Sequence, residues 1–136
     1  MGELTPQYLA GFFDGEGSVC ITYDNSGQPK LRVSLANNYR PVIEQVKQQF
    51  SGSINRSSGN CYQWWLYKTE KMFQFLTYVK PYLIVKQKEV TIALTLLTTM
   101  GTSGTRYTEQ EVLVKARLCE MFMVAVRERN LGIEGI

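Results

Sequence analysis

Y-L-A-G-F-F-D-G-E-G-S, residues 8–18, is the stretch around which the rest of the chain is expected to fold. Thr5 is a suitable N-cap and Pro6 fits the first helical position, so the stretch begins as a helix. Gly11 and Gly15 lie four residues apart and leave a groove without side chains. Glycine inside a helix costs about 1 kcal/mol relative to alanine. Close approach of another backbone, such as a second copy of this helix, is the natural reason for two glycines.

Two acidic residues, Asp14 and Glu16, stand near the end of this helix. The helix macrodipole already makes that end negative, so a positive partner is expected beside them. A divalent cation is the simplest candidate. The alternative is a buried helix that ends at Gly15 or Gly17 with both acids in water. The residues alone leave both possibilities open.

Composition predicts a soluble globular protein. The 136 residues are 44% hydrophobic and 20% charged, which fits a single domain over residues 1–136. No apolar run approaches the ~20 residues of a membrane span, and the first residues lack a signal-peptide pattern, so no membrane partner is expected. Three cysteines without C-x-x-C spacing indicate a reducing compartment, a cytoplasm or an organelle matrix, and argue against zinc.

The sequence contains no histidine. This excludes a Ser-His-Asp triad, a Cys-His pair and those nucleases whose general base or metal ligand is histidine. Hydrolytic chemistry would have to use carboxylates, lysine and metal-bound water. The formal net charge of +3 permits a polyanionic partner without demanding one.

Two β-hairpins alternate with helices along the chain. The first hairpin pairs residues 18–24 with 30–36, and the second pairs residues 53–56 with 61–68. Further helices are expected at 41–50, 69–81, 86–100 and from a capping box at 108–111 onward, with a loop at 101–106. The hairpins can join into one four-stranded antiparallel sheet with helices on one face, which is an α+β fold.

The other face of this sheet is expected to be open, polar and wide enough to lie along a DNA major groove. Candidates for base contacts are Thr22, Asp24, Gln28, Lys30, Arg32 and Ser34 from the first hairpin, and Arg56, Ser58, Gln63, Trp65 and Lys68 from the second. Aromatic residues lie on both sides of the last strand, so either side could belong to the core.

Residues 9–17, L-A-G-F-F-D-G-E-G, resemble the nine-residue signature of the LAGLIDADG homing endonucleases. P-Y-L-I-V-K-Q-K-E at 81–89 and the hairpin-helix-hairpin pattern resemble the single-motif branch of that family. The resemblance implies an α+β fold with its open sheet face on double-stranded DNA. It also implies a site-specific enzyme that makes a staggered double-strand break in a long pseudo-palindromic site by phosphodiester hydrolysis, with Mg²⁺ and no small-molecule cofactor.

The same resemblance implies roles for individual residues. Glu16 matches the motif acid that binds the catalytic metal, and Gly15 matches the position whose backbone carbonyl helps to ligate it. Asp14 matches the other motif acid, which terminates the helix. Three further catalytic candidates match positions near the hydrolytic water or the scissile phosphate: Lys86, Asn37 and Arg40. Members often carry glutamine where this chain has the shorter asparagine.

One signature supplies one Glu16 per chain, which is too few for two strand cuts. Two copies packed through Gly11, Phe12 and Gly15 would bring two such carboxylates to a twofold axis, so a homodimer is expected. Three alternatives stay open: an intron RNA maturase, a non-cleaving DNA-binding regulator on the same scaffold, and pairing with a different half. Metal-dependent cleavage separates the endonuclease from the first two.

Overall fold

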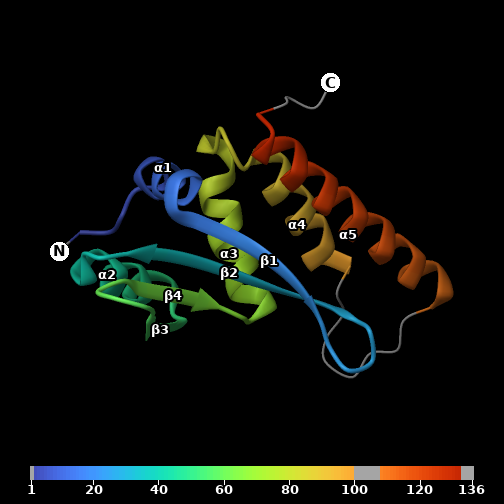
Figure 1. Ribbon diagram of the computed structural model, residues 1–136, viewed down its shortest axis with the longest axis horizontal. Coiled ribbons are helices and arrows are strands. Elements are labelled where there is room, and N and C mark those ends of the chain that lie inside the picture. The colour runs from blue at the N-terminus through green and yellow to red at the C-terminus, as the bar shows by residue number, and fades with distance from the viewer. Residues whose placement is uncertain (1, 100–107, 133–136) are drawn as a thin grey trace.

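The computed structural model describes residues 2–99 and 108–132 and has a twisted antiparallel sheet with helices packed on it (Figure 1). In chain order the elements are α1 (Pro6–Glu16), β1 (Gly17–Tyr23), β2 (Pro29–Asn37), α2 (Arg40–Phe50), β3 (Ser53–Arg56), β4 (Tyr62–Leu66), α3 (Thr69–Val79), the 3-10 turn η1 (Lys80–Tyr82), α4 (Gln87–Thr99) and α5 (Glu109–Asn130). The expected order of helices and hairpins is confirmed. The expected loop at 101–106 and the helix end at Met100 lie outside the described residues.

The four strands join in the order β1-β2-β4-β3, and each neighbouring pair is antiparallel. The two hairpins therefore meet through β2 and β4, where Leu35 lies opposite Trp64. This confirms the predicted four-stranded α+β fold. None of the helices in the described ranges is long and apolar enough to cross a membrane.

The signature helix begins and ends as its residues dictate. The Thr5 side chain accepts a hydrogen bond from the Tyr8 amide at 3.1 Å, and Pro6 occupies the first turn. At the other end the chain turns directly from α1 into β1 at Gly17. A Cβ atom there would overlap the ring of Phe13, which is fully buried. Glycine is therefore the residue that lets β1 start against the core.

An aromatic cluster fills the space between the sheet and the helices. Phe75 of α3 lies at its centre, with ring centroids 5.5 Å from Phe13, 5.1 Å from Phe50 and 5.1 Å from Trp64. The indole of Trp64 also donates to the Ser51 carbonyl at 2.7 Å, so its polar atom is satisfied inside the core. The burial of Trp64 settles which side of β4 faces the helices.

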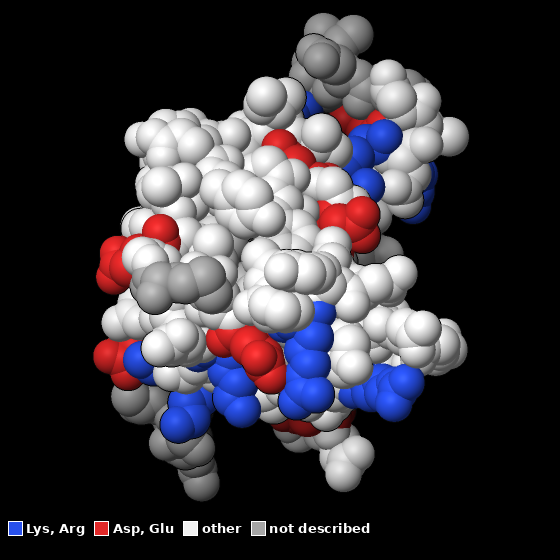
Figure 2. Space-filling model, turned by 90° about the vertical axis from the view of Figure 1, so that its left-hand side faces the viewer, with Lys and Arg blue, Asp and Glu red and all other residues white. Residues whose placement is uncertain are grey.

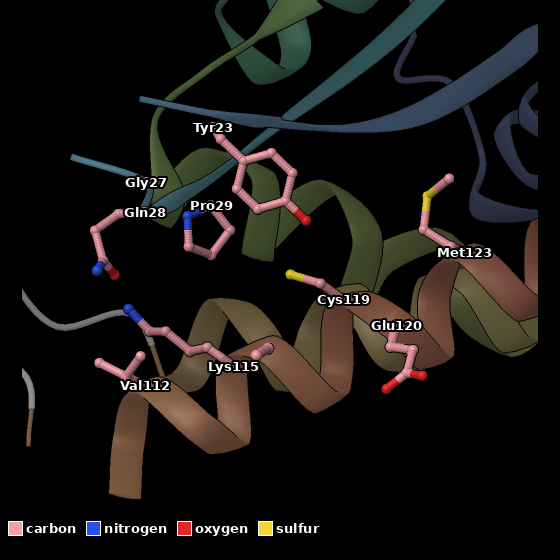
Figure 3. A pocket seen from close by; sticks show the side chains of 10 residues that line it. Tyr23, Gly27, Gln28, Pro29, Val112, Lys115, Cys119, Glu120 and Met123 are labelled. Atoms are coloured by element: carbon pink, nitrogen blue, oxygen red, sulfur yellow. The ribbon is translucent and has the colours of Figure 1, made fainter. Parts of the chain in front are cut away.

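The last helix, α5, packs along α4 and extends beyond the turn of the first hairpin (Figure 1). Between that turn and α5 lies a cavity of about 260 Å³, lined in part by Tyr23, Gln28, Lys115 and Cys119 (Figure 3). The Tyr23 hydroxyl points toward the Cys119 thiol, and burial raises the pKa of both groups. The turn of the first hairpin and the N-terminal half of α5 thus enclose this cavity.

Candidate active site and nucleic-acid interface

Asp14 ties the end of α1 to the segment that precedes α4. Its Oδ2 accepts from the Ile84 amide at 2.7 Å, and its Oδ1 accepts from the Lys86 amide at 3.0 Å. The helix continues to Glu16, so the expectation that Asp14 terminates it is wrong. The carboxylate instead satisfies two backbone donors that belong to no strand and would otherwise bond only to water. Asp14 therefore fixes the position of Lys86 relative to α1.

The side chain of Lys86 lies inside the protein, with the residue 5% exposed. Its Nζ donates to the backbone carbonyl of Asp14 at 2.6 Å and lies 6.0 Å from the ring centroid of Phe13. Burial lowers the pKa of Lys86, and the guanidinium of Arg129 lowers it further, while nearby carboxylates act in the opposite direction. A lysine whose pKa is displaced in this way, beside the end of the signature helix, is typical of a functional site.

Glu16, the last residue of α1, is exposed and is one of the carboxylates that act on Lys86. Gly15 beside it is also exposed, and a Cβ atom there would meet no described atom within 4 Å. Within the described residues, no group of three or more acidic or cysteine side chains could hold a metal ion. Both carboxylate oxygens of the nearby Asp14 already accept backbone hydrogen bonds, so Mg²⁺ bound at Glu16 would need further oxygen donors from elsewhere.

Asn37 and Arg40 lie where β2 leads into α2. Leu35 pairs with Gly17, so Asn37 reaches past the start of β1 toward the end of α1. Its Oδ1 accepts from the Tyr39 amide at 2.8 Å, an Asx-type contact that shapes the connection. In the described part of the chain, no hydrogen bond or ion pair joins Asn37 or Arg40 to Glu16 or Lys86. Their catalytic roles stay predictions.

Arg40 is the first residue of α2 and is held by two contacts. Its Nε donates to Glu44 at 2.8 Å, and its guanidinium lies 5.5 Å from the ring centroid of Tyr62. Beside it runs a groove of about 640 Å³ lined by Arg40, Glu44, Lys47, Gln48, Ile54, Arg56 and Tyr62. In Figure 2, Lys and Arg gather across the lower part of the face, at the height of α2 and β3 in Figure 1.

The outer face of the sheet carries most of the strand residues predicted for DNA contact. Alternation from the buried positions places six of them there together: Thr22, Lys30, Arg32, Ser34, Gln63 and Trp65. The guanidinium of Arg32 lies 5.3 Å from the Trp65 ring, and that ring stacks on Tyr67 at 6.4 Å. This planar group of one arginine and two aromatic rings was only partly predicted, because Tyr67 was not among the candidates.

One of these six residues is buried, and two other predicted contact residues do not lie on the outer face. Ser34 lies on the outer face, opposite Ser18 and Trp65, but it is 3% exposed and its hydroxyl shares a 2.9 Å hydrogen bond with that of Ser18. Arg56 pairs with Tyr62 and shares the face of Ile54, so it lines the groove beside α2. Lys68 follows the end of β4 and is the N-cap residue of α3.

The remaining three candidates belong to turns. The Asp24 carboxylate accepts from the Ser26 amide, the Ser26 hydroxyl and the Gln28 amide, so it shapes the first hairpin turn. These bonds, led by the Ser26 hydroxyl, lower the pKa of Asp24. The side chain of Gln28 lines the cavity above α5 (Figure 3), and Ser58 is exposed in the second turn.

The sequence did not single out two charged residues that meet near Lys86. Glu89 of α4 is 2% exposed, and its Oε1 accepts a hydrogen bond from Nε of Arg129 in the last turn of α5. An acid three residues after Lys86 was visible in the run K-Q-K-E. Its partner, forty residues later, was visible only as a positive charge near a helix end.

The chain belongs to the LAGLIDADG endonuclease family, whose model matches residues 9–96. Three solved structures share the fold. Homing endonuclease I-CvuI, in complex with its target, is 13% identical with a TM-score of 0.74, over 88% of this chain and 80% of that one. The archaeal intron-encoded homing endonuclease I-Vdi141I, complexed with DNA, is 21% identical with a TM-score of 0.70, over 90% and 82%. Homing endonuclease I-TnaI is 19% identical with a TM-score of 0.66, over 94% and 99%. No curated protein matches the chain.

Proposed function

We propose that this protein is a homing endonuclease that acts as a homodimer and makes a staggered double-strand break in a long pseudo-palindromic DNA site. The observation that carries the proposal is that an exposed Glu16 carboxylate and a buried Lys86 ammonium, whose pKa that carboxylate influences, both lie at the end of the signature helix. A carboxylate and a lysine with a lowered pKa are the groups that hydrolysis without histidine requires.

The outer sheet face supports duplex DNA as the substrate. It presents hydroxyl, amide and cationic groups at a strand spacing that suits base edges in a major groove. The stacked group of Arg32, Trp65 and Tyr67 adds a flat cationic surface at its centre. I-CvuI and I-Vdi141I, which share the fold, are described in complex with DNA.

The exposed side of α1 supports the homodimer. A Cβ atom at Gly11 or Gly15 would meet no described atom within 4 Å, so another backbone could approach this side closely. Tyr8 on the same helix is 52% exposed and Phe12 is half-buried. A twofold contact here would place two Glu16 residues beside the axis and explain a palindromic site.

Mg²⁺ would be held by the Glu16 carboxylate and the Gly15 carbonyl of each chain, with phosphate and water supplying the other oxygen donors. When bound, the ion supplies Lewis-acid chemistry at the scissile phosphate. Lys86, kept in place by the Asp14 carbonyl, is the group that we assign to exchange a proton with water or to stabilise negative charge on the phosphate. A structure of I-CvuI obtained with Mg is described as holding uncleaved DNA.

The decisive experiment compares the wild type with Glu16→Gln on a library of long duplexes, with Mg²⁺ and with Ca²⁺, and scores binding and cleavage separately. Glu70→Gln, an exposed acid in the first turn of α3, is the matched control. We expect the wild type and the control to cut one pseudo-palindromic site with Mg²⁺, and Glu16→Gln to bind it without cutting. Tight binding of duplex DNA or structured RNA by a wild type that cuts under no metal would instead indicate a binding protein.

A further inference from the structure

We propose that Arg129 is a positioning residue, which acts through Glu89 to hold the Lys86 side chain against the end of α1. The inference rests on the proposed function, because it assigns α5 a part in the same active site. Arg129 lies outside residues 9–96, the segment that the family model matches. The structure, and not the signature, therefore points to it.

The first step of the argument is the ion pair itself. The Glu89 side chain is 3% exposed and that of Arg129 is 28% exposed, so the carboxylate is buried and the guanidinium partly reaches the surface. A carboxylate buried to this degree is costly unless it is paired and hydrogen-bonded. Glu89 lies in the first turn of α4, three residues after Lys86. The pair therefore fastens the C-terminal turn of α5 to the turn that carries the lysine.

The second step is the effect on the ammonium. Three carboxylates attract it, from Asp14 and Glu16 on α1 and from Glu89 on α4, while Arg129 on α5 repels it. Nζ makes its 2.6 Å hydrogen bond on the α1 side, to the carbonyl of Asp14. The charge of Arg129 therefore opposes the attraction of Glu89 for the ammonium, while the hydrogen bond holds Nζ at α1. Without Arg129, Glu89 would be left unpaired three residues from Lys86, and it would compete with α1 for the Lys86 ammonium.

The test uses Arg129→Met and the double variant Glu89→Met/Arg129→Met, which replaces the ion pair by apolar groups of similar length and keeps the fold testable. Arg129→Lys is the conservative rescue, because it preserves the charge. Arg127→Met, in the same last turn and exposed, is the matched control. Each folded variant is measured for duplex Kd with Ca²⁺, for single-turnover cleavage with Mg²⁺, and for the rate at which acetic anhydride acylates Lys86, read by mass spectrometry.

We expect both methionine variants at position 129 to bind DNA as the wild type does but to cut it about tenfold more slowly, since displacing a reacting group has effects of this order or larger. Lys86 should be acylated several-fold faster in both, and Arg129→Lys should recover most of the cleavage rate. Arg127→Met should match the wild type in all three measurements.

Acylation of Lys86 at the wild-type rate in the folded variants would overturn the proposal, and so would a parallel loss of binding and cleavage without faster acylation. The acylation rate needs no cleavage. If the wild type cuts no duplex, the proposed function fails, while the role of Arg129 is still judged by the accessibility of Lys86.

Discussion

Replacing Asp14 with alanine should loosen the segment that carries Lys86 while leaving α1 helical. The carboxylate accepts backbone hydrogen bonds from Ile84 and Lys86 at 2.7 and 3.0 Å. Bonds to charged groups contribute about 1.5–3 kcal/mol each, and the lower value applies because solvent reaches this site, giving about 3 kcal/mol for the pair. The higher helix propensity of alanine offsets about 0.7 kcal/mol of this loss of stability. Removing an acid from the negative end of the helix offsets about 0.5 kcal/mol more of the loss. The net cost is about 2 kcal/mol.

The assay combines urea denaturation with hydrogen exchange at the amides of Ile84 and Lys86. Both amides should exchange faster in Asp14→Ala. Single-turnover cleavage should fall because the Asp14 carboxylate no longer holds the backbone of Lys86 in place. Glu16→Ala is the control for stability, since this exposed acid lies two residues further along the same helix end. Unchanged protection of both amides in Asp14→Ala, or an equal loss of stability in the control, would refute the reasoning.

Three further outcomes are expected. Gly11→Leu should raise the stability of the single chain slightly, by about 0.8 kcal/mol of helix propensity, yet abolish the dimer in sedimentation velocity; a dimer of wild-type affinity would contradict the proposed interface. Gly17→Ala should cost about 1–3 kcal/mol in urea denaturation because its Cβ would overlap Phe13, whereas Gly15→Ala should not destabilise. Because burial and Arg129 lower the pKa of Lys86 from 10.5, the unfolded chain binds more protons just below pH 10.5. Stability should therefore rise with pH in that window, and Lys86→Met should flatten the rise.

Local features of the fold could be predicted because their physical causes are local. Thr5 and Pro6 start α1 through contacts within one turn, and strict alternation at 30–36 reveals a strand with one buried side whatever it pairs with. The family resemblance could be recognised for the same reason, since its signature is nine consecutive residues. Glu16 could be predicted as a site residue from that signature alone.

Contacts between distant residues could not be predicted in this way. Period-two alternation gives two sides of a strand but does not say which one meets the helices. In β4 both sides carry aromatics, and only the packing of Trp64 against Phe75 decided it. Arg56 was assigned to the wrong face because it pairs with Tyr62, which shares the side of β4 that meets the helices.

The helix that carries the acids, the two hairpins and the family could all be inferred from the sequence, because each depends on residues that are neighbours along the chain. The burial of Lys86, and its anchoring by Asp14 about seventy residues away, became visible only in the packed structure. It alone joined Glu89 to Arg129 across two helices. Burial and pairing of charges arise from desolvation and Coulomb forces in three dimensions, and these forces leave no periodic pattern in a sequence.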